Sequence, residues 1–355
     1  MVSLVVPRLV NDPFGDPGLF VDFRSSRRAL LFDIGELQMV PPRKLLRVSH
    51  VFVSHTHLDH FNGFDHLLRH CLGRPKQLAL VGPPGFIDQV HHKLAAYSWN
   101  LVVENEVDFV IGAAEFDGQH LAGAAEFHSR DAFTRRSVMP PCLPAGVLLD
   151  EEDFQVRATM LDHGIASLAF AFAEKPRVNV WKDRLRDLGL AVGPWLTQAK
   201  RAARRGDPDD TLVVARRKAE GGGGTTDITL GALKAEAFQI GPGETFAYVV
   251  DACYHEQNAA RIIGLAHEVG TLFIETVFLD EDEEIAARKR HLTTVQAGSL
   301  ARRAGAKRLV PFHFSPRYRD REDLLRREVE SAFAGVIDAD RGDEEQVATL
   351  KGLPE

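Results

Sequence analysis

The seven residues Ser54–His60, reading Ser-His-Thr-His-Leu-Asp-His, constrain the fold of this chain more than any other segment. They place three imidazoles and a carboxylate directly after Val51-Phe52-Val53, an apolar run typical of a buried strand. Imidazole and carboxylate together suit Zn²⁺ and neighbouring divalent ions. The sequence therefore predicts a sheet whose edge carries a metal-binding cluster.

The spacing within this motif divides its ligands between two ions. His55 and His57 are two residues apart on an extended segment, so both side chains can point the same way. Asp59 and His60 follow after the chain has turned, and they can face a second ion. The ordinary alternative is a set of surface histidines, since the chain has 15 of them. Four ligand-type residues within six positions favour the metal site.

The composition indicates a globular protein with a sizeable core, because 45% of the residues are hydrophobic and 26% are charged. No segment has the pattern of a signal peptide or approaches the ~20 apolar residues of a membrane span, so we expect a cytoplasmic protein with no membrane association. Cys71, Cys142 and Cys253 are far apart, which argues against disulfides and a thiolate zinc site. They are expected to be small core residues.

The net charge of −7 offers no global attraction to DNA, RNA or anionic lipid. One segment is nevertheless basic, because residues 175–205 hold nine cations and only two acids, Asp183 and Asp187. A solvated helical face and a local site for a polyanion both fit this pattern.

Apolar runs and turn residues predict the secondary structure. Helical spacing predicts helices at Gly85–Tyr97, Asn258–Val269, His291–Ala304 and around Leu324–Phe333, with a frayed acidic end after the last. Two similar halves of sheet and outer helix predict an α/β fold. The predicted strands contain Leu4–Val6, Leu19–Val21, Leu30–Phe32, Val51–Val53, Leu78–Val81, Leu168–Phe172, Phe246–Val250, Leu272–Ile274 and Arg308–Pro311.

Between Glu174 and Gly224 the pattern changes. Turn residues such as Gly193-Pro194 alternate with short amphipathic fragments and a basic run, and the segment ends in the Gly221–Gly224 linker. We expect residues 174–224 to form a protruding arm with little core of its own, inserted into a single domain that spans residues 1–355.

Three more candidate ligands lie singly in the second half of the chain. His163 follows Met160-Leu161-Asp162, Asp251 closes an apolar run, and His313 follows Leu309–Phe312. A lone histidine beside an apolar run is more often a hydrogen-bonded core residue. Their shared position at the ends of predicted strands favours the metal site.

With these residues in place, the chain resembles the metallo-β-lactamase superfamily and, within it, the ribonuclease Z family of tRNA 3′-endonucleases. Ser54–His60 carries the superfamily resemblance, which implies an αββα sandwich with an inserted arm. The family resemblance runs in order through almost the whole chain. It is carried by Leu31–Glu36, Gly82–Gly85, Glu174-Lys175-Pro176-Arg177, Gly193-Pro194, Glu275–Phe278, His291-Leu292-Thr293-Thr294 and His313-Phe314-Ser315-Pro316-Arg317-Tyr318.

The resemblance implies two zinc ions, with Mn²⁺ or Fe²⁺ as alternatives, and a ligand set for each. One ion would be held by His55, His57 and His163, the other by Asp59, His60 and His313, with Asp251 bridging them. A hydroxide shared by ions about 3.5–4 Å apart is a nucleophile at neutral pH and would attack the phosphorus of a phosphodiester.

The resemblance also implies roles for three catalytic residues. Asp59 would orient the attacking water or take its proton, and His291 would stabilise the transition state or protonate the leaving oxygen. Glu275 would support a cationic His291, although an ordinary charge at a strand end is the alternative for this residue.

The substrate implied by the family is precursor tRNA, cut after the discriminator nucleotide by a homodimer. The arm, including Lys175, Arg177, Gly193 and Pro194, would grip the tRNA elbow. Arg317 and Arg319 would hold a phosphate that flanks the scissile bond.

Departures from the family pattern leave other functions open. Asp251 stands in Val-Asp-Ala where Gly-Asp-Thr is typical, and the usual Gly-Thr-Gly opening near the first strand is missing. One alternative is a small-molecule hydrolase of the same fold acting on a cyclic nucleotide, lactone or sulfate ester. Another is a catalytically silent RNA-binding protein, which the complete ligand set disfavours.

Overall fold

The computed structural model describes residues 3–24, 26–104, 106–217 and 224–337, which form two compact units. The main unit comprises Met1–Leu149, Val156–Phe172 and Thr245–Glu355, and the excursion unit comprises Asp150–Gln155 and Ala173–Glu244. None of the described helices has the length and apolar character of a membrane span.

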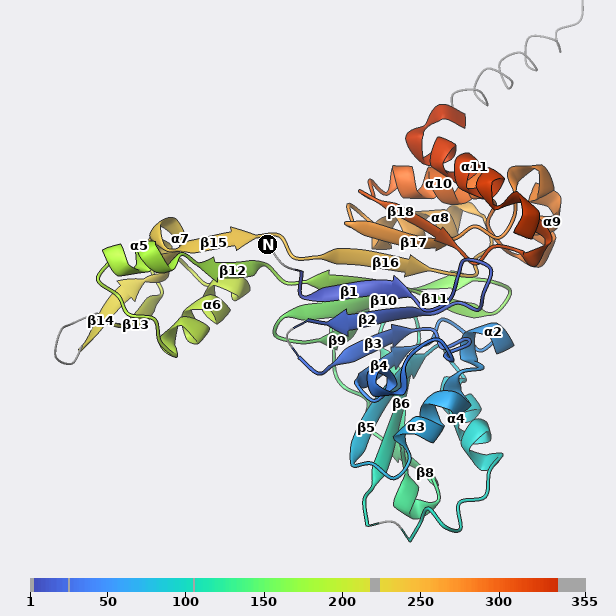
Figure 1. Ribbon diagram of the computed structural model, residues 1–355, viewed down its shortest axis with the longest axis horizontal. Helices are drawn as coiled ribbons and strands as arrows, with labels where there is room; N and C mark the ends of the chain where they lie inside the picture. The colour runs from blue at the N-terminus through green and yellow to red at the C-terminus, as the bar shows by residue number, and fades with distance from the viewer. Residues whose placement is uncertain (1–2, 25, 105, 218–223, 338–355) are drawn as a thin grey trace, which may run out of the picture. The chain divides into compact units, whose positions relative to one another are not determined.

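The first sheet of the main unit has eight strands in sequential order, parallel from β3 to β6 and antiparallel at both ends (Figure 1). Because β3 and β4 are parallel, the loops that follow them meet at the same edge of the sheet. The strands are β1 (Val5–Leu9), β2 (Leu19–Phe23), β3 (Ala29–Phe32), β4 (Val48–Phe52), β5 (Lys76–Gly82), β6 (Phe109–Phe116), β7 (Leu121–His128) and β8 (Arg135–Val138).

The second sheet has six strands in the order β18-β17-β16-β11-β10-β9, and β16, β17 and β18 are parallel. Its strands are β9 (Val147–Asp150), β10 (Phe154–Asp162), β11 (Ala166–Glu174), β16 (Thr245–Val249), β17 (Thr271–Glu275) and β18 (Leu309–Phe312).

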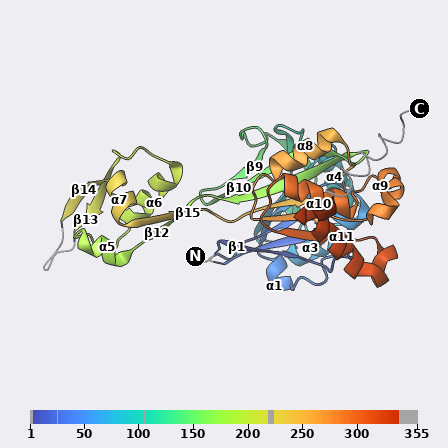
Figure 2. The same cartoon turned by 90° about the horizontal axis from the view of Figure 1, so that it is seen from above.

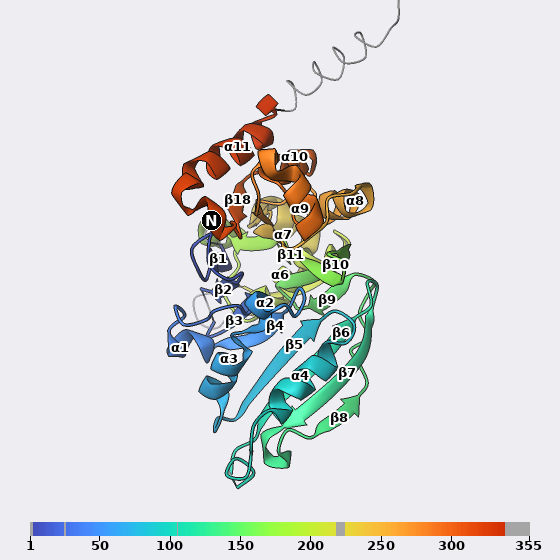
Figure 3. The same cartoon turned by 90° about the vertical axis from the view of Figure 1, so that its right-hand side faces the viewer.

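Aromatic side chains join the two sheets face to face. The ring of Phe170 on β11 lies 5.5 Å from that of Phe32 on β3 and 5.9 Å from that of Phe52 on β4. Helices cover the outer faces (Figure 3): α3 (Phe64–Cys71) and α4 (Phe86–Ala95) pack on the first sheet, and α8 (Glu256–Leu265), α10 (Thr294–Arg303) and α11 (Glu322–Ala334) pack on the second. The predicted αββα sandwich is confirmed.

Three short helices and three 3₁₀ segments complete the main unit's connections. They are α1 (Pro42–Leu45), α2 (Leu58–Phe61), α9 (Glu283–Lys289), η1 (Ser129–Asp131), η2 (Asp280–Asp282) and η3 (Pro316–Arg321). Of these, α2 carries two of the predicted ligands, Asp59 and His60, in the turn that follows β4.

Helix α10 begins three residues later than the sequence predicted. The Thr293 hydroxyl accepts a hydrogen bond from the backbone of Gln296, and the Gln296 side chain accepts one from the backbone of Thr293. This capping box starts the helix at Thr294. His291 therefore lies in the loop before the helix, where its ring can face the edge of the sheets.

The excursion unit is built from two antiparallel strand pairs and three helices (Figure 2). Its buried cluster includes Val178, Leu185, Ala199 and Leu233. Its elements are β12 (Arg177–Val180), α5 (Lys182–Asp187), α6 (Trp195–Arg205), β13 (Leu212–Arg216), β14 (Thr225–Thr229), α7 (Leu230–Glu236) and β15 (Phe238–Gly241).

This unit differs from the predicted arm in two respects. It has a core of its own, and it ends at Glu244 rather than Gly224 because β15 pairs with β12 and closes the unit. The predicted linker lies largely outside the described residues, as does the predicted acidic end of the chain. Of the three free cysteines, Cys71 is buried but Cys142 is exposed, so the expectation of a core residue is wrong for Cys142.

Candidate metal centre

The predicted ligands converge where β4, β10, β16 and β18 end. The seven predicted ligands form two groups of side chains, each of which could hold a metal ion. The ligand atoms within each group lie within 4.8 Å of one another. The first consists of His55, His57, His163 and Asp251, and the second of Asp59, His60 and His313.

Asp251 connects the two groups through its two carboxylate oxygens. Its Oδ2 lies 3.5 Å from His55 Nε2 and 3.3 Å from His163 Nε2. Its Oδ1 lies 3.4 Å from His60 Nε2 and 3.0 Å from His313 Nδ1. On the far side of the second group, Asp59 Oδ2 lies 3.4 Å from His313 Nε2. One carboxylate thus faces both groups.

Several of these atoms are buried without a hydrogen-bond partner among the described residues: His55 Nε2, His60 Nε2, His313 Nδ1 and Asp251 Oδ1. Buried polar atoms are normally satisfied, and nitrogen and oxygen donors of this kind are ligands for divalent transition metals. The donor set therefore fits metal ions.

The pKa shifts of the histidines also favour a metal site. Burial and the neighbouring His60 lower the pKa of His55 to about 2, so His55 is a neutral imidazole suited to ligation. Burial alone would also lower the pKa of His313, but Asp251 and Asp59 raise it to about 10. The carboxylates of Asp251 and Asp59 therefore stabilise positive charge at this place, and divalent cations would supply it.

Unusual backbone geometry sets the direction of these side chains. Asp33, Asp251 and His313 have φ values of 55°, 35° and 61°, in the region that non-glycine residues rarely adopt. Each lies just after a strand, and such conformations persist only where the surrounding structure holds them. The strand ends are thus adapted to the cluster.

A cavity of about 340 Å³ opens in front of the cluster. His57, Asp59, His291 and His313 line it, and His291 Nδ1 lies 2.7 Å from Glu275 Oε2. Burial opposes a charge on His291, but the Glu275 carboxylate raises its pKa above the usual value. The other lining residues come from the β1–β2 loop, from the segments that follow β16, β17 and β18, and from the end of α9: Phe14, Gly15, Asp16, Asp251, Val277, Phe278, Lys289, Phe314, Ser315 and Pro316.

The chain is 30% identical to the Ribonuclease Z of Deinococcus radiodurans over 325 residues, which cover 90% of this chain and 93% of that protein. It belongs to the ribonuclease Z family. The Ribonuclease Z of Nocardia farcinica is also 30% identical, over 88% of this chain and 86% of that protein. Membership confirms the predicted family and the predicted enzyme class, a metal-dependent phosphodiester hydrolase.

The fold has a solved counterpart in the metallo-beta-lactamase fold protein YhfI from Bacillus subtilis. The two share a TM-score of 0.51 and 15% identity, over 93% of this chain and 94% of that one, a likeness that concerns the fold alone. No family model matches the chain.

Asp33 is a positioning residue that sequence reasoning did not assign. Its carboxylate is fully buried and accepts hydrogen bonds from the backbone and hydroxyl of Ser54 at 2.6 and 2.9 Å. Its Oδ2 also lies 2.9 Å from His60 Nδ1, which aims Nε2 of that ring at Asp251. An acidic residue ending the strand beside the histidine motif was the signal for this role.

Asn258 joins two ligand-bearing loops. Its side-chain amide donates to the carbonyls of Asp162 and Cys253, each at 2.8 Å, and its oxygen accepts from Asp162 N at 3.0 Å. It thereby ties the loop of His163 to the loop of Asp251. Nothing in the sequence marked this residue, because it falls within an amphipathic helix pattern.

Two glycines allow the loop after β3 to approach α2. A Cβ on Gly35 would lie 2.2 Å from the carbonyl oxygen of Asp59, and one on Gly63 would lie 2.2 Å from that of Gly35. Any side chain at either position would push Asp59 and His60 away from the other ligands.

The residues expected to bind phosphate near the cluster are placed differently from the prediction. Neither Arg317 nor Arg319 lines the cavity, and Arg317 Nη1 lies 3.6 Å from Asp282 Oδ2. Lys289, at the end of α9, instead brings a positive charge to the cavity wall. Asp16 in the β1–β2 loop brings an additional carboxylate. Sequence reasoning missed both residues.

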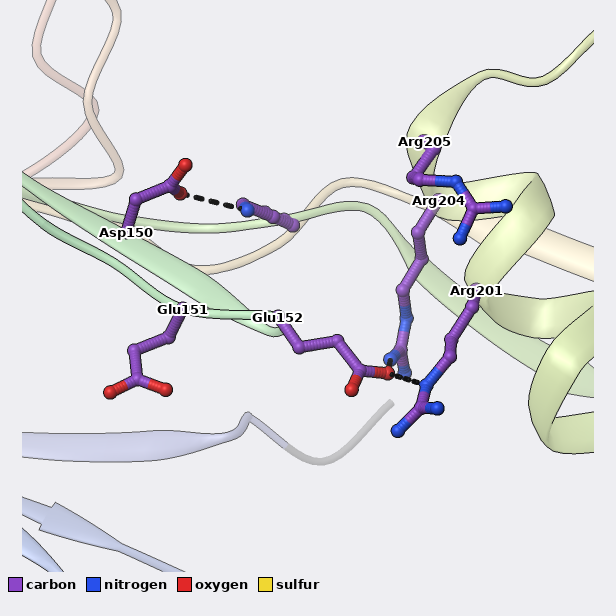
Figure 4. Close-up of a pocket in the computed structure, with 7 residues that line it drawn as sticks. Asp150, Glu151, Glu152, Arg201, Arg204 and Arg205 are labelled. Carbon is purple, nitrogen blue, oxygen red and sulfur yellow. Dashed lines mark hydrogen bonds and ion pairs between the residues drawn. The ribbon is translucent and has the colours of Figure 1, made fainter. Parts of the chain in front are cut away.

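In the excursion unit, the predicted RNA-binding cations have acidic partners. Lys175 Nζ lies 2.8 Å from Asp150, Arg201 Nε donates to Glu152 at 2.6 Å, and Arg177 pairs with Glu174. Figure 4 shows Arg201 and Arg204 reaching from α6 toward Glu152, around a cavity of about 680 Å³. Gly193 and Pro194 directly precede α6, and Pro194 is its N-cap residue.

Proposed function

We propose that this protein is a zinc-dependent endoribonuclease that removes the 3′ trailer from precursor tRNA. The observation that carries the proposal is the position of Asp251, whose two oxygens face two complete groups of metal ligands. Support for the substrate comes from the relatives named Ribonuclease Z, which match nearly the whole chain. Mn²⁺ or Fe²⁺ would suit the same donors.

His55, His57 and His163 would hold one ion, Asp59, His60 and His313 the other, and Asp251 would bridge them. When bound, the ions supply Lewis-acid stabilisation of the phosphoryl oxygens and lower the pKa of water. Asp33 and Asn258 would keep the ligands in register, since the first holds the His60 ring and the second holds the loops of His163 and Asp251.

Asp59 would orient the attacking water and accept its proton. Its side chain is 44% exposed and lines the cavity, while its Oδ2 is near His313, so the carboxylate can reach both the cluster and a substrate. Water then attacks phosphorus, and the bond from phosphorus to the 3′-oxygen breaks.

His291 would donate a proton to the departing 3′-oxygen, leaving a 3′-hydroxyl on the tRNA. Because Nδ1 is bound to Glu275, the opposite ring nitrogen is available to the cavity. Glu275 in turn accepts a hydrogen bond from Ala252 N at 2.8 Å, beside Asp251. This bond fixes the carboxylate as a positioning residue for His291.

The excursion unit would contact the RNA away from the scissile bond, through Lys175, Arg177 and the α6 arginines, with Gly193-Pro194 shaping the start of α6. Lys289 would meet a phosphate at the cavity. Arg317 and Arg319 would then contact only phosphates outside the cavity. We further propose that the protein is cytoplasmic and forms a homodimer. Sedimentation of the purified protein would test the dimer.

The deciding experiment incubates the zinc-loaded protein with end-labelled precursor tRNA and compares Asp59→Ala with the wild type. We expect Asp59→Ala to abolish cleavage while RNA affinity stays within about twofold, because the cations proposed to bind RNA are not members of the cluster. A wild-type protein that hydrolyses a cyclic nucleotide or a lactone but not the RNA would support the small-molecule alternative. Full activity of Asp59→Ala would overturn the mechanism.

A further inference from the structure

The main unit carries a second concentration of positive charge, which no part of the metal centre uses. Two cavities of about 820 and 300 Å³ share Arg24, Lys44 and Arg47 in their walls, so they form one continuous depression. We call it the basic groove. Six cations and one carboxylate, Asp22, line it: Arg8, Arg24, Arg27, Arg43, Lys44 and Arg47.

The floor of the basic groove is held by Arg47. Its guanidinium donates to the carbonyls of Phe23 at 3.1 Å and Ser26 at 2.9 Å, and it pairs with Asp22 at 2.8 Å. Lys44 lies 3.6 Å from the same carboxylate. The only carboxylate that lines the groove, Asp22, is therefore already paired with Arg47 and Lys44.

The rim of the basic groove is different. Arg8, Arg24, Arg27 and Arg43 are exposed, and the described part of the chain provides no ion pair for any of them. Four uncompensated guanidinium groups in one depression repel one another, and the chain as a whole has a net charge of −7. Such a surface favours an anionic partner with several charges.

The basic groove lies at the end of the first sheet opposite the metal centre. Arg24 and Arg27 precede β3 and Arg47 precedes β4, whereas Asp33 and Ser54–His60 follow those strands. Seven residues of extended chain from Arg47 to Ser54 span roughly 20 Å. The groove therefore cannot hold the scissile phosphate, and any phosphates it holds are remote from the cut.

The lining favours a nucleic-acid backbone over a protein partner. Guanidinium groups match phosphate oxygens in a bidentate manner. The larger cavity has one apolar lining residue, Leu46, and in the smaller cavity the rings of Phe20 and Phe23 are buried, so charged side chains form most of the accessible lining. The centres of protein interfaces are instead apolar and aromatic. We propose that the basic groove binds the phosphate backbone of the RNA substrate, an inference that rests on the proposed function.

The test removes three rim charges together, in the variant Arg24→Gln/Arg27→Gln/Arg43→Gln. We expect the affinity for precursor tRNA to fall about tenfold at moderate salt. The slope of log affinity against log salt concentration should shrink by roughly 2 to 3, because each of the three lost phosphate contacts removes just under 1. The kcat at saturating RNA and the hydrolysis of a nitrophenyl phosphate diester should not change. The matching lysine triple variant should restore the slope.

The control removes three exposed cations of the main unit outside the basic groove, in Arg157→Gln/Arg303→Gln/Lys307→Gln, and should leave RNA affinity within about twofold. If the wild-type protein cleaves precursor tRNA but the groove variant keeps the wild-type RNA affinity and salt slope, this inference is overturned and the proposed function is not. A protein would then be the better candidate for the partner of the groove. A wild-type protein that hydrolyses the diester but does not cleave the RNA would overturn the proposed function and this inference with it.

Discussion

The metal centre and the α6 face of the excursion unit both bring acids and bases together, but in opposite surroundings. His60 and Asp251 are buried, with side chains 0% and 3% exposed. Arg201 and Glu152, which pair on the α6 face, are 49% and 45% exposed. The same kinds of contact therefore have different consequences in the two places.

Burial explains the difference. A buried charged group that loses its partner cannot be solvated, so the groups of the metal centre depend strongly on one another. An exposed pair is screened by water and salt and contributes little to stability. The α6 arginines can therefore change partners at small cost, whereas the buried groups of the metal centre depend on one arrangement.

The largest effect is expected at Asp251, which belongs to the first ligand group and faces the second. We expect Asp251→Ala to reduce bound zinc from two equivalents to below one, and cleavage of both RNA and a small diester to fall at least about a thousandfold. Metal analysis and initial rates measure this. Asp150→Ala in the excursion unit is the control and should retain both ions. Two bound ions in Asp251→Ala would show that the carboxylate does not bridge.

A smaller effect is expected at Asp33, which acts through His60. Because Asp33→Asn keeps the shape but loses the charge, we expect zinc affinity to fall about 10- to 100-fold in a chelator competition. Asp108→Asn is a matched control, since Asp108 lies 2.7 Å from His128 Nδ1 in a partly exposed pair. Equal zinc affinity in the two variants would contradict the positioning role of Asp33.

At the cavity wall, Lys289 and Arg317 separate two interpretations of phosphate binding. We expect Lys289→Ala to lower kcat/KM for precursor tRNA about tenfold, as one lost charge-assisted contact would. Arg317→Ala should change it less than about twofold, because this side chain faces Asp282 outside the cavity. The reverse order would return Arg317 to the role predicted from the sequence.

The smallest effects are expected on the α6 face. Replacing its acidic partners in Glu152→Gln/Asp153→Asn frees Arg201 and Arg204, so RNA should bind a few-fold more tightly at low salt. Arg201→Gln/Arg204→Gln should bind a few-fold more weakly, and both effects should vanish at high salt. Fluorescence anisotropy of labelled tRNA measures this. Unchanged affinity in both variants would remove α6 from the RNA-binding surface.

Point variants suit the excursion unit better than deletion does. Removing residues 175–224 would take away β12 but leave its partner β15, and would expose Leu230 and Leu233 of α7. A loss of activity would then report on damage to the core of the unit. Charge changes on exposed side chains avoid that ambiguity.

The sequence by itself predicted the layers and which residues are candidate ligands. Parallel strands end at one edge, so single ligand-type residues after His-rich or apolar runs, such as His163 and His313, could be assigned to one place before any contact was known. The strands around Phe32 and Phe246 were equally visible, because a buried strand reads as a continuous apolar run.

Only the tertiary structure decided which other side chains support or surround that place. The Asp33 carboxylate accepts a hydrogen bond from the Tyr248 hydroxyl, 215 positions away in the sequence. The Asn258 side chain donates one to the Asp162 carbonyl, 96 positions away. The basic groove gathers arginines from the β2–β3 loop, from α1 and from the residue before β4, and β15 pairs with β12 to close the excursion unit. Periodicity records which face of an element is buried, but not which distant residue lies opposite it. Contacts between distant segments depend on how the elements pack, and a local pattern does not contain that information.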